Sequence, residues 1–173
     1  MGRAGFASEV SALEHHGALM PDYLLRPVRP GDAAAIASHR ARMFHDMGEL
    51  SDDEVAPLEA ASRDQLGPLI DSGEYFGWVI DTGGTVVAGV GVFMHRLLPR
   101  RRDLGLRQEA YVVNVFTEPA HRRRGLSRRL MQELITWCRT NGITRITLHA
   151  APAGRPLYES LGFTATNEMR LVL

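Results

Sequence analysis

Residues 114–129 combine residue types and a spacing suited to binding a phosphate group. A strand-like run from Tyr111 to Thr117 stops at Pro119, and a basic turn containing Gly125 then leads into a helical pattern. Such a turn gathers backbone N–H groups at the positive end of a helix dipole, where an anion binds well. The stretch therefore predicts a phosphate or pyrophosphate site, and the alternative is an arginine-rich exposed turn.

The spacing in this stretch resembles a known signature. Arg122-x-x-Gly125-x-Ser127 resembles the Arg/Gln-x-x-Gly-x-Gly/Ala motif of the GCN5-related N-acetyltransferases, the GNAT superfamily, and Pro119 stands three residues before the arginine as it does there. Ser127 departs from the usual Gly or Ala, but its small side chain should still let a phosphate approach the backbone. Further along, the run from Leu157 to Phe163 (LYESLGF) resembles the second signature of the family. The resemblance covers roughly residues 22–172.

The resemblance implies a fold and a donor substrate. The fold would be α/β (α+β), a single GNAT-like domain with a central mixed, mostly antiparallel twisted sheet flanked by helices. The donor would be acetyl-CoA, with no metal. Its pantetheine arm would pair with the backbone of a central strand, here Val115, Phe116 and Thr117, and the Val115 N–H would polarise the thioester carbonyl. Its pyrophosphate would lie over the turn formed by Arg122, Arg123, Arg124, Gly125, Leu126, Ser127 and Arg128.

Tyr158 matches the tyrosine that many family members use to protonate the departing thiolate. A phenol suits this task because its pKa of about 10 exceeds the roughly 8.5 of an ordinary thiol. The alternative is a core aromatic residue within Leu157-Tyr158-x-x-Leu161. The asparagine that the family commonly has seven residues earlier is Ala151 here, so the resemblance does not imply that contact to the cofactor.

The general base is less well defined by the sequence. An aliphatic amine is mostly cationic at neutral pH, so a side chain must take its proton, often through water. The catalytic candidates are Glu109 at the start of the central strand, His149 on the next strand, and Asn114 as a residue that holds water. His45 or Asp46 from the first helix are further candidates, and Glu168 near the C-terminus is a weaker one.

Composition limits the other classes of function. The 173 residues are 45% hydrophobic, enough for one domain with a core, which we place at 21–173 after a loose arm at 1–20. No run approaches the ~18 apolar residues of a membrane span, and a single cysteine, Cys138, fits a reducing cytoplasm. The seven histidines lack zinc-ligand spacing, and the neutral net charge argues against a nucleic-acid partner. A homodimer is left open.

Charge is unevenly distributed along the chain. Ten arginines lie between Arg96 and Arg129, and nine acids lie between Asp46 and Glu74. These blocks are usually solvated faces; alternatively they indicate two ligands of opposite charge, anionic CoA and a cationic amine. We therefore expect acetyl transfer to a small-molecule amine, with a preference for a dication. A protein or peptide N-terminal acetyltransferase and a catalytically silent acyl-CoA-binding module are the alternatives.

Periodicity and turn residues predict the order strand, helix, helix, three strands, helix, strand, helix, strand. Asp32 should cap the first helix, which ends near Gly48. Leu97–Gln108 should be a loop. The other elements are expected at Tyr23–Val28, Pro57–Ile70, Tyr75–Ile80, Thr85–Met94, Glu109–Thr117, a helix through Leu126 and Trp137 that stops at Asn141, Thr144–Ala150, Arg155–Leu161 and Phe163–Val172.

Overall fold

The computed structural model describes residues 22–99, 101 and 107–172. The loose arm predicted at 1–20 lies outside the described residues, as do residues 100 and 102–106 of the loop predicted at 97–108. The ends of that loop need correction, because Leu97 still belongs to one strand and Arg107 already begins the next. No helix in the described ranges is both long enough and apolar enough to cross a membrane.

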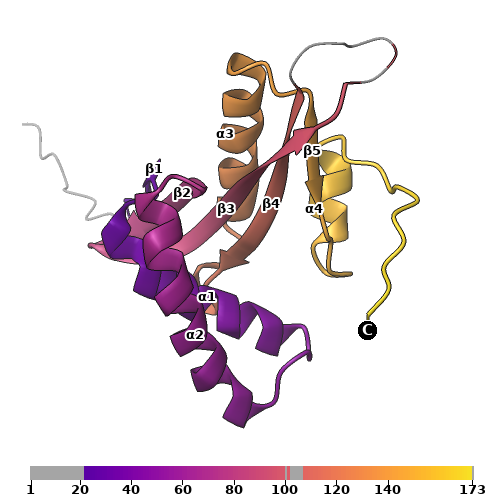
Figure 1. Ribbon diagram of the computed structural model, residues 1–173. Coiled ribbons are helices and arrows are strands. Elements are labelled where there is room, and N and C mark those ends of the chain that lie inside the picture. Colours follow the sequence, from indigo (N-terminus) through magenta and orange to yellow (C-terminus); the bar gives the residue numbers. More distant parts are fainter. Residues whose placement is uncertain (1–21, 100, 102–106, 173) are drawn as a thin grey trace, which may run out of the picture.

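The centre of the structure is a five-stranded sheet whose strands lie in chain order (Figure 1). Strands β1 to β4 are antiparallel neighbours, and β5 joins β4 in parallel. This confirms the mixed, mostly antiparallel sheet that the resemblance implied. The strands are β1 Leu24–Pro27, β2 Tyr75–Thr82, β3 Thr85–Leu97, β4 Arg107–Thr117 and β5 Arg145–Leu148.

Helices cover both faces of this sheet (Figure 1). Helix α3 (Leu126–Thr140) buries Leu126, Leu130 and Leu134 against one face, as expected from their helical spacing. Helices α1 (Ala33–Asp46) and α2 (Asp52–Asp71) pack on the other face. The remaining helical segments are η1 Pro30–Asp32, η2 Pro119–His121 and α4 Arg155–Ser160.

Two predicted helix starts need correction. Helix α2 begins at Asp52 rather than Pro57, because Ser51 and Glu54 form a capping box that fixes the earlier start. Asp32 does precede α1, but its carboxylate makes no cap to that helix. It accepts hydrogen bonds from the Arg26 guanidinium instead, which ties η1 to β1.

The strand predicted at Phe163–Val172 is wrong, since these residues have no regular structure. Its last apolar residues cover no face of the sheet: Met169, Leu171 and Val172 are 94%, 82% and 83% exposed. The segment returns past β5 (Figure 1), where Glu168 and Arg170 both hydrogen-bond to His149. Strand β5 therefore remains the edge of the described sheet.

Candidate active site

A gap opens in the sheet where β4 and β5 part. The two strands pair only from Glu109 to Val112 on β4, although β4 continues to Thr117. A cavity of about 1200 Å³ lies at this gap, lined by residues 112–117 on one side and by 148–154 and Tyr158 on the other. The backbone of β4 beyond Val112 thus presents hydrogen-bonding groups to the cavity with no strand beside them.

The glycine turn lies at the end of β4, next to this gap. Gly125 has φ +76° and Arg123 has φ +63°, so two left-handed residues turn the chain into α3. Helix α3 begins without a side-chain cap, which leaves the N–H groups of its first turn available. No atom lies within 4 Å of a Cβ built on Gly125, so the space beside the turn is open. The turn therefore has the donors and the room for a phosphate.

The basic residues of the turn divide into two kinds. Arg122 donates from Nε to the Thr117 carbonyl at 2.9 Å and also pairs with Asp46, so it fixes the turn to the end of β4 and to α1. Arg123 and Arg124 are exposed. These two side chains supply positive charge that a ligand can approach.

Two contacts fix α3 to its neighbours. Ser127 and Thr117 share a hydrogen bond of 2.9 Å between their hydroxyl oxygens, which joins the start of α3 to the end of β4. Arg128 donates to the Ser160 hydroxyl at 2.8 Å and so links α3 to α4. The serine that replaces the usual small apolar residue thus has a structural partner.

Tyr158 lies on α4 and lines the same cavity. It is 9% exposed, and burial raises the pKa of its phenol above the usual value. Its ring packs edge-on against Phe163, with centroids 5.9 Å apart. A Cβ at Gly154 would stand 3.0 Å from that ring, so glycine makes room for it. The phenol is a proton donor that stays protonated at neutral pH.

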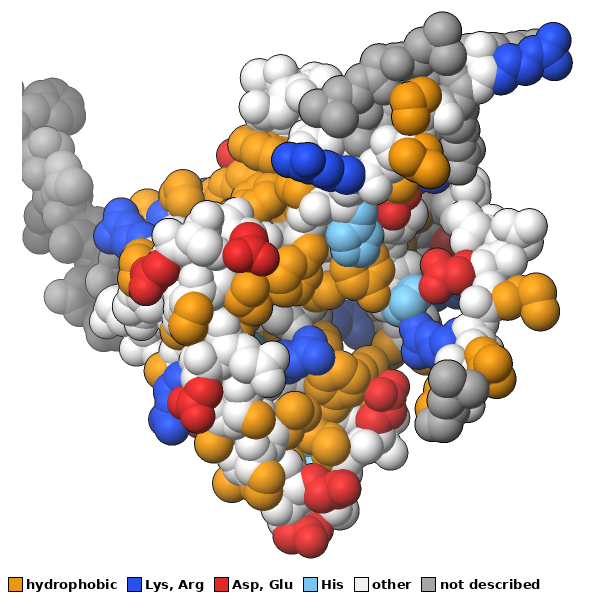
Figure 2. All heavy atoms as spheres, in the orientation of Figure 1, with side chains coloured by type: hydrophobic (Ala, Val, Ile, Leu, Met, Phe, Trp, Pro, Cys, Tyr) orange, Lys and Arg blue, Asp and Glu red, His pale blue; other side chains and the backbone are white. Residues whose placement is uncertain are grey.

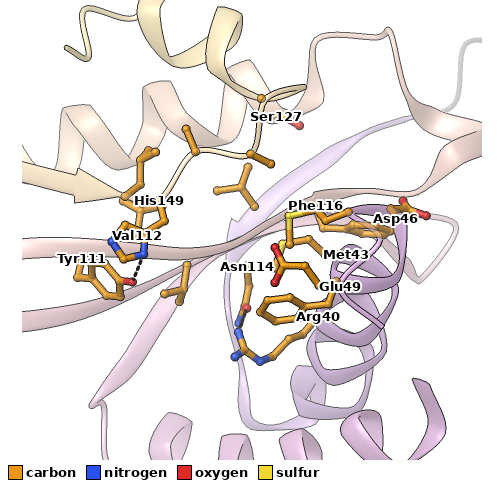
Figure 3. Close-up of a pocket in the computed structure, with 18 of the residues that line it drawn as sticks. Arg40, Met43, Asp46, Glu49, Tyr111, Val112, Asn114, Phe116, Ser127 and His149 are labelled. Carbon is orange, nitrogen blue, oxygen red and sulfur yellow. Dashed lines mark hydrogen bonds between the residues drawn. The ribbon is translucent and has the colours of Figure 1, made fainter. Parts of the chain in front are cut away.

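Asn114 is buried at the centre of the cavity wall, where β3 and β4 slip in register between Gly89 and Gly91. Its φ is +55°, a conformation that asparagine tolerates better than most residues. Its amide oxygen accepts a hydrogen bond of 2.7 Å from Arg40, as Figure 3 shows. The carboxamide is therefore committed to neighbouring side chains.

The other predicted base candidates lie in different surroundings. Glu109 lies at the closed, paired end of β4, where it accepts hydrogen bonds from Thr147 at 2.9 Å and Arg145 at 3.5 Å. His149 lines the cavity and approaches the Tyr111 hydroxyl at 3.3 Å. The structure therefore brings His149, but not Glu109, to the cavity with Tyr158.

The remaining base candidates also have partners. His45 hydrogen-bonds to exposed Asp52 at 2.8 Å, and Glu168 to His149 at the same distance. Asp46 lines the cavity but is paired with Arg122.

Sequence reasoning missed Glu49 as a cavity residue. It follows Gly48, whose left-handed φ of +74° ends α1, and its side chain lines the cavity (Figure 3). Within the described ranges the Glu49 carboxylate has no hydrogen-bond or ion-pair partner. Only its position after a helix-stopping glycine could have indicated this.

The acidic run has little contact with the cavity. Of the nine acids, only Asp46 and Glu49 line it. Asp52, Asp53 and Glu54 are exposed at the start of α2. Figure 2 shows the cavity as a hollow framed mainly by apolar side chains, with basic side chains visible inside it.

The chain is similar to proteins that are named as acetyltransferases. It is 31% identical over 106 residues to YitH, an uncharacterised N-acetyltransferase of Bacillus subtilis; the match takes in 61% of this chain but only 33% of YitH. A GCN5-related N-acetyltransferase from Ralstonia eutropha is 31% identical, with a TM-score of 0.79 over 87% of this chain and 98% of its own. A predicted acetyltransferase with acetyl-CoA from Clostridium acetobutylicum shares the fold at 20% identity, with a TM-score of 0.75 over 87% of this chain and 96% of its own.

The sequence profile of the Acetyltransferase (GNAT) family matches residues 39–163. This range includes the turn at Gly125, the gap between β4 and β5, and Tyr158. The chain therefore belongs to the GNAT acetyltransferase family.

Proposed function

We propose that the protein transfers an acetyl group from acetyl-CoA directly to the primary amine of a small molecule. The observation that carries the proposal is the gap between β4 and β5. It brings unpaired strand backbone, an uncapped helix start at Gly125 and the buried phenol of Tyr158 to one cavity. Each of these features suits one part of a thioester substrate.

The residues present fit acetyl-CoA. Its pyrophosphate would be held by the N–H groups of Gly125, Leu126 and Ser127, with Arg123 and Arg124 adding charge. Its pantetheine arm would occupy the gap beside Val115, Phe116 and Thr117 and extend the sheet there. When bound, acetyl-CoA supplies an activated acyl group.

The chemistry of the chain's own residues can be assigned from their positions. The Val115 N–H stabilises negative charge that develops on the acyl oxygen. As the amine nitrogen forms its bond to the acyl carbon and the carbon–sulfur bond breaks, Tyr158 donates its proton to the sulfur. The raised pKa keeps that proton available at neutral pH.

The proton of the amine must pass to a base. Glu49 is the cavity carboxylate without a partner among the described residues, so we assign it this role, through water where needed. His149 is the alternative, since it also lines the cavity. Asn114 is assigned a positioning role because both ends of its carboxamide are engaged.

The cavity favours a small acceptor over a peptide. Ser62, Leu66 and Leu69 of α2 close one side of it, while Arg170 of the C-terminal segment borders the other. A folded protein substrate would have to present a free N-terminus within these walls. A small amine enters without this requirement.

A panel of small amines and peptide N-termini tests the proposal when it is assayed by free-thiol release from acetyl-CoA. A titration of CoA against the melting temperature should accompany it. Thiol release with small amines and none with peptides is the expected result. Stabilisation by CoA without thiol release from any amine would instead favour a silent binding module.

A further inference from the structure

The guanidinium of Arg40 lies in the half of the cavity away from the Gly125 turn. Its Nη1 donates to the Asn114 amide oxygen at 2.7 Å (Figure 3). Its Cζ lies 4.8 Å from the centre of the Phe44 ring. Both residues line the cavity with it. In the parts of the chain that the structure describes, no carboxylate forms an ion pair with Arg40.

Other partly buried arginines do have carboxylate partners. Arg26 binds Asp32 and Asp81, and Arg42 binds Glu118. A charge removed from water ordinarily needs such a counter-ion. Arg40 differs in that its remaining N–H donors face a cavity instead of an acid.

Most side chains in the part of the cavity around Arg40 are apolar, although Glu49, Ser62 and Gln65 also line it. This half of the cavity is lined by Met43, Phe44, Met47, Leu66, Leu69 and Phe93. In such surroundings an opposite charge interacts more strongly with a guanidinium than it does in water. A planar guanidinium matches the two oxygens of a carboxylate in a paired geometry.

We propose that Arg40 binds a carboxylate of the acceptor, so that the substrate is an amino acid with an apolar side chain. This inference rests on the proposed acetyl transfer and names its substrate class. The carboxylate would lie on Arg40, and the side chain would pack against the methionine and leucine residues of the wall. The amine would then lie between Arg40 and the acyl-binding strand.

Two features support that placement of the amine. Asn114, which holds Arg40, directly precedes Val115, whose N–H is assigned to the acyl oxygen. Glu49 lines the same half of the cavity and carries the charge that an ammonium group requires. The cavity thus offers a cation and an anion to a zwitterionic acceptor.

The proposal opposes the dication preference suggested by the acidic run. Seven of the nine acids do not line the cavity, and one of the two that do is paired with Arg122. Arg40 would repel the second positive charge of a diamine. The two hypotheses therefore predict opposite rankings of the same compounds.

The test compares phenylalanine, leucine and methionine with their own primary amides and with diamines. We expect kcat/KM for each free acid to exceed that for its amide by roughly 10- to 100-fold, the range for a hydrogen-bonded charge pair. Arg40→Gln should remove this preference, mainly through KM for the acid. Arg40→Lys should retain part of it, since the charge remains.

Arg63→Gln is the matched control, because Arg63 is exposed on α2 and does not line the cavity. It should retain the full preference. Melting temperatures and CoA-induced shifts establish that the Arg40 variants fold and bind the donor. Equal use of acids and amides by the unaltered enzyme, or the same ratio in Arg40→Gln, would overturn the proposal while acetyl transfer stands.

A binding measurement separates this proposal from the transfer reaction. The same acids and amides are titrated against the CoA-saturated protein and followed by melting temperature. Stabilisation by acids that Arg40→Gln removes supports the carboxylate site, even if no thiol is released and acetyl transfer to these amines fails. Equal effects of acids and amides here would overturn the site independently of activity.

Discussion

The carboxamide of Asn114 joins Arg40 to Tyr75 across the cavity wall. Its oxygen accepts from Arg40 at 2.7 Å and its nitrogen donates to the Tyr75 hydroxyl at 3.2 Å. Burial raises the pKa of Tyr75 to about 12, so this hydroxyl remains neutral at physiological pH. A Cβ at Gly91 would lie 2.0 Å from that oxygen, and the strand therefore needs glycine there. The orientation of Arg40 is thus set by groups on three separate elements.

Asn114→Asp should weaken acceptor binding without removing a single heavy-atom contact. Aspartate has the same shape and also tolerates the left-handed backbone. The new carboxylate would neutralise Arg40, and KM for an apolar amino acid should rise by roughly 10-fold, the lower range for a charged hydrogen bond. Steady-state kinetics measure this. Asn167→Asp, on the exposed C-terminal segment, is the control; an unchanged KM in Asn114→Asp would contradict the role of Arg40.

Tyr158→Phe should lower kcat by roughly 10²- to 10⁴-fold, the usual range for loss of an acid catalyst. The melting shift produced by CoA should be retained, because the ring still fills its place against Phe163. Burial raises the Tyr158 pKa, so the unaltered enzyme should lose its acid only above about pH 10.

Tyr23→Phe serves as the control for loss of a tyrosine hydroxyl. Tyr23 bonds to His121 at 2.9 Å and does not line the cavity, so kcat should change little. Comparable rates for Tyr158→Phe and Tyr23→Phe would reduce Tyr158 to a packing residue.

Gly125→Val should abolish most of the stabilisation by CoA. The φ of +76° disfavours valine, and its side chain would occupy the open space beside the N–H groups of α3. Gly142→Val provides a matched control. Gly142 has φ +70° and equally open surroundings, but it follows the far end of α3, so the backbone strain is similar without the ligand contact. Melting curves with and without CoA compare them, and an equal CoA shift in both variants would contradict the phosphate site.

Asp32→Asn should destabilise the fold by about 1–3 kcal/mol near neutral pH, the cost of losing a partner of a buried charge. Burial disfavours the Asp32 carboxylate, but hydrogen bonds from Arg26 and from the Arg29 N–H outweigh it and hold its pKa below the usual value. Because the folded pKa is depressed, the stabilisation is present above the unfolded pKa of about 4 and is lost as pH falls through the folded value.

Denaturant titrations at several pH values measure this difference. The difference in free energy of unfolding between the unaltered protein and Asp32→Asn should disappear as the solution is acidified below about pH 4. Asp64→Asn, at an exposed position of α2, should track the unaltered protein throughout. A difference in free energy of unfolding that stayed constant with pH would exclude the carboxylate charge as its source.

Local signals predicted the elements that form the proposed donor site. Three contiguous elements form it: the strand ending at Thr117, the turn at Gly125 and the start of α3. Each has a characteristic spacing or residue type in the sequence. Tyr158 follows another short motif and lies on the cavity as expected. These features depend on neighbours within a few residues, which is why sequence reasoning reached them.

The acceptor half depends on contacts between distant residues. The hydrogen bond between Arg40 and Asn114 joins residues 74 positions apart in the sequence, so no local pattern indicates it. The strand predicted at Phe163–Val172 is absent for a related reason: a strand needs a neighbouring strand to pair with, and β5 has no further partner in the described sheet. The local sequence pattern does not show which distant segments pair in a sheet.

Because β4 and β5 separate after Val112, hydrogen exchange of the β4 backbone should report whether a ligand occupies the gap. Amide hydrogens of residues 113–117 that face the gap have no strand partner on that side, so they should exchange rapidly with deuterated solvent. Amides of the same strand that bond to β3 should exchange slowly whether or not a ligand is present. A donor lying along the gap would slow only the first set. Deuterium uptake, measured for each backbone amide, would therefore show where the bound donor lies along β4. The measurement does not require the enzyme to catalyse the reaction.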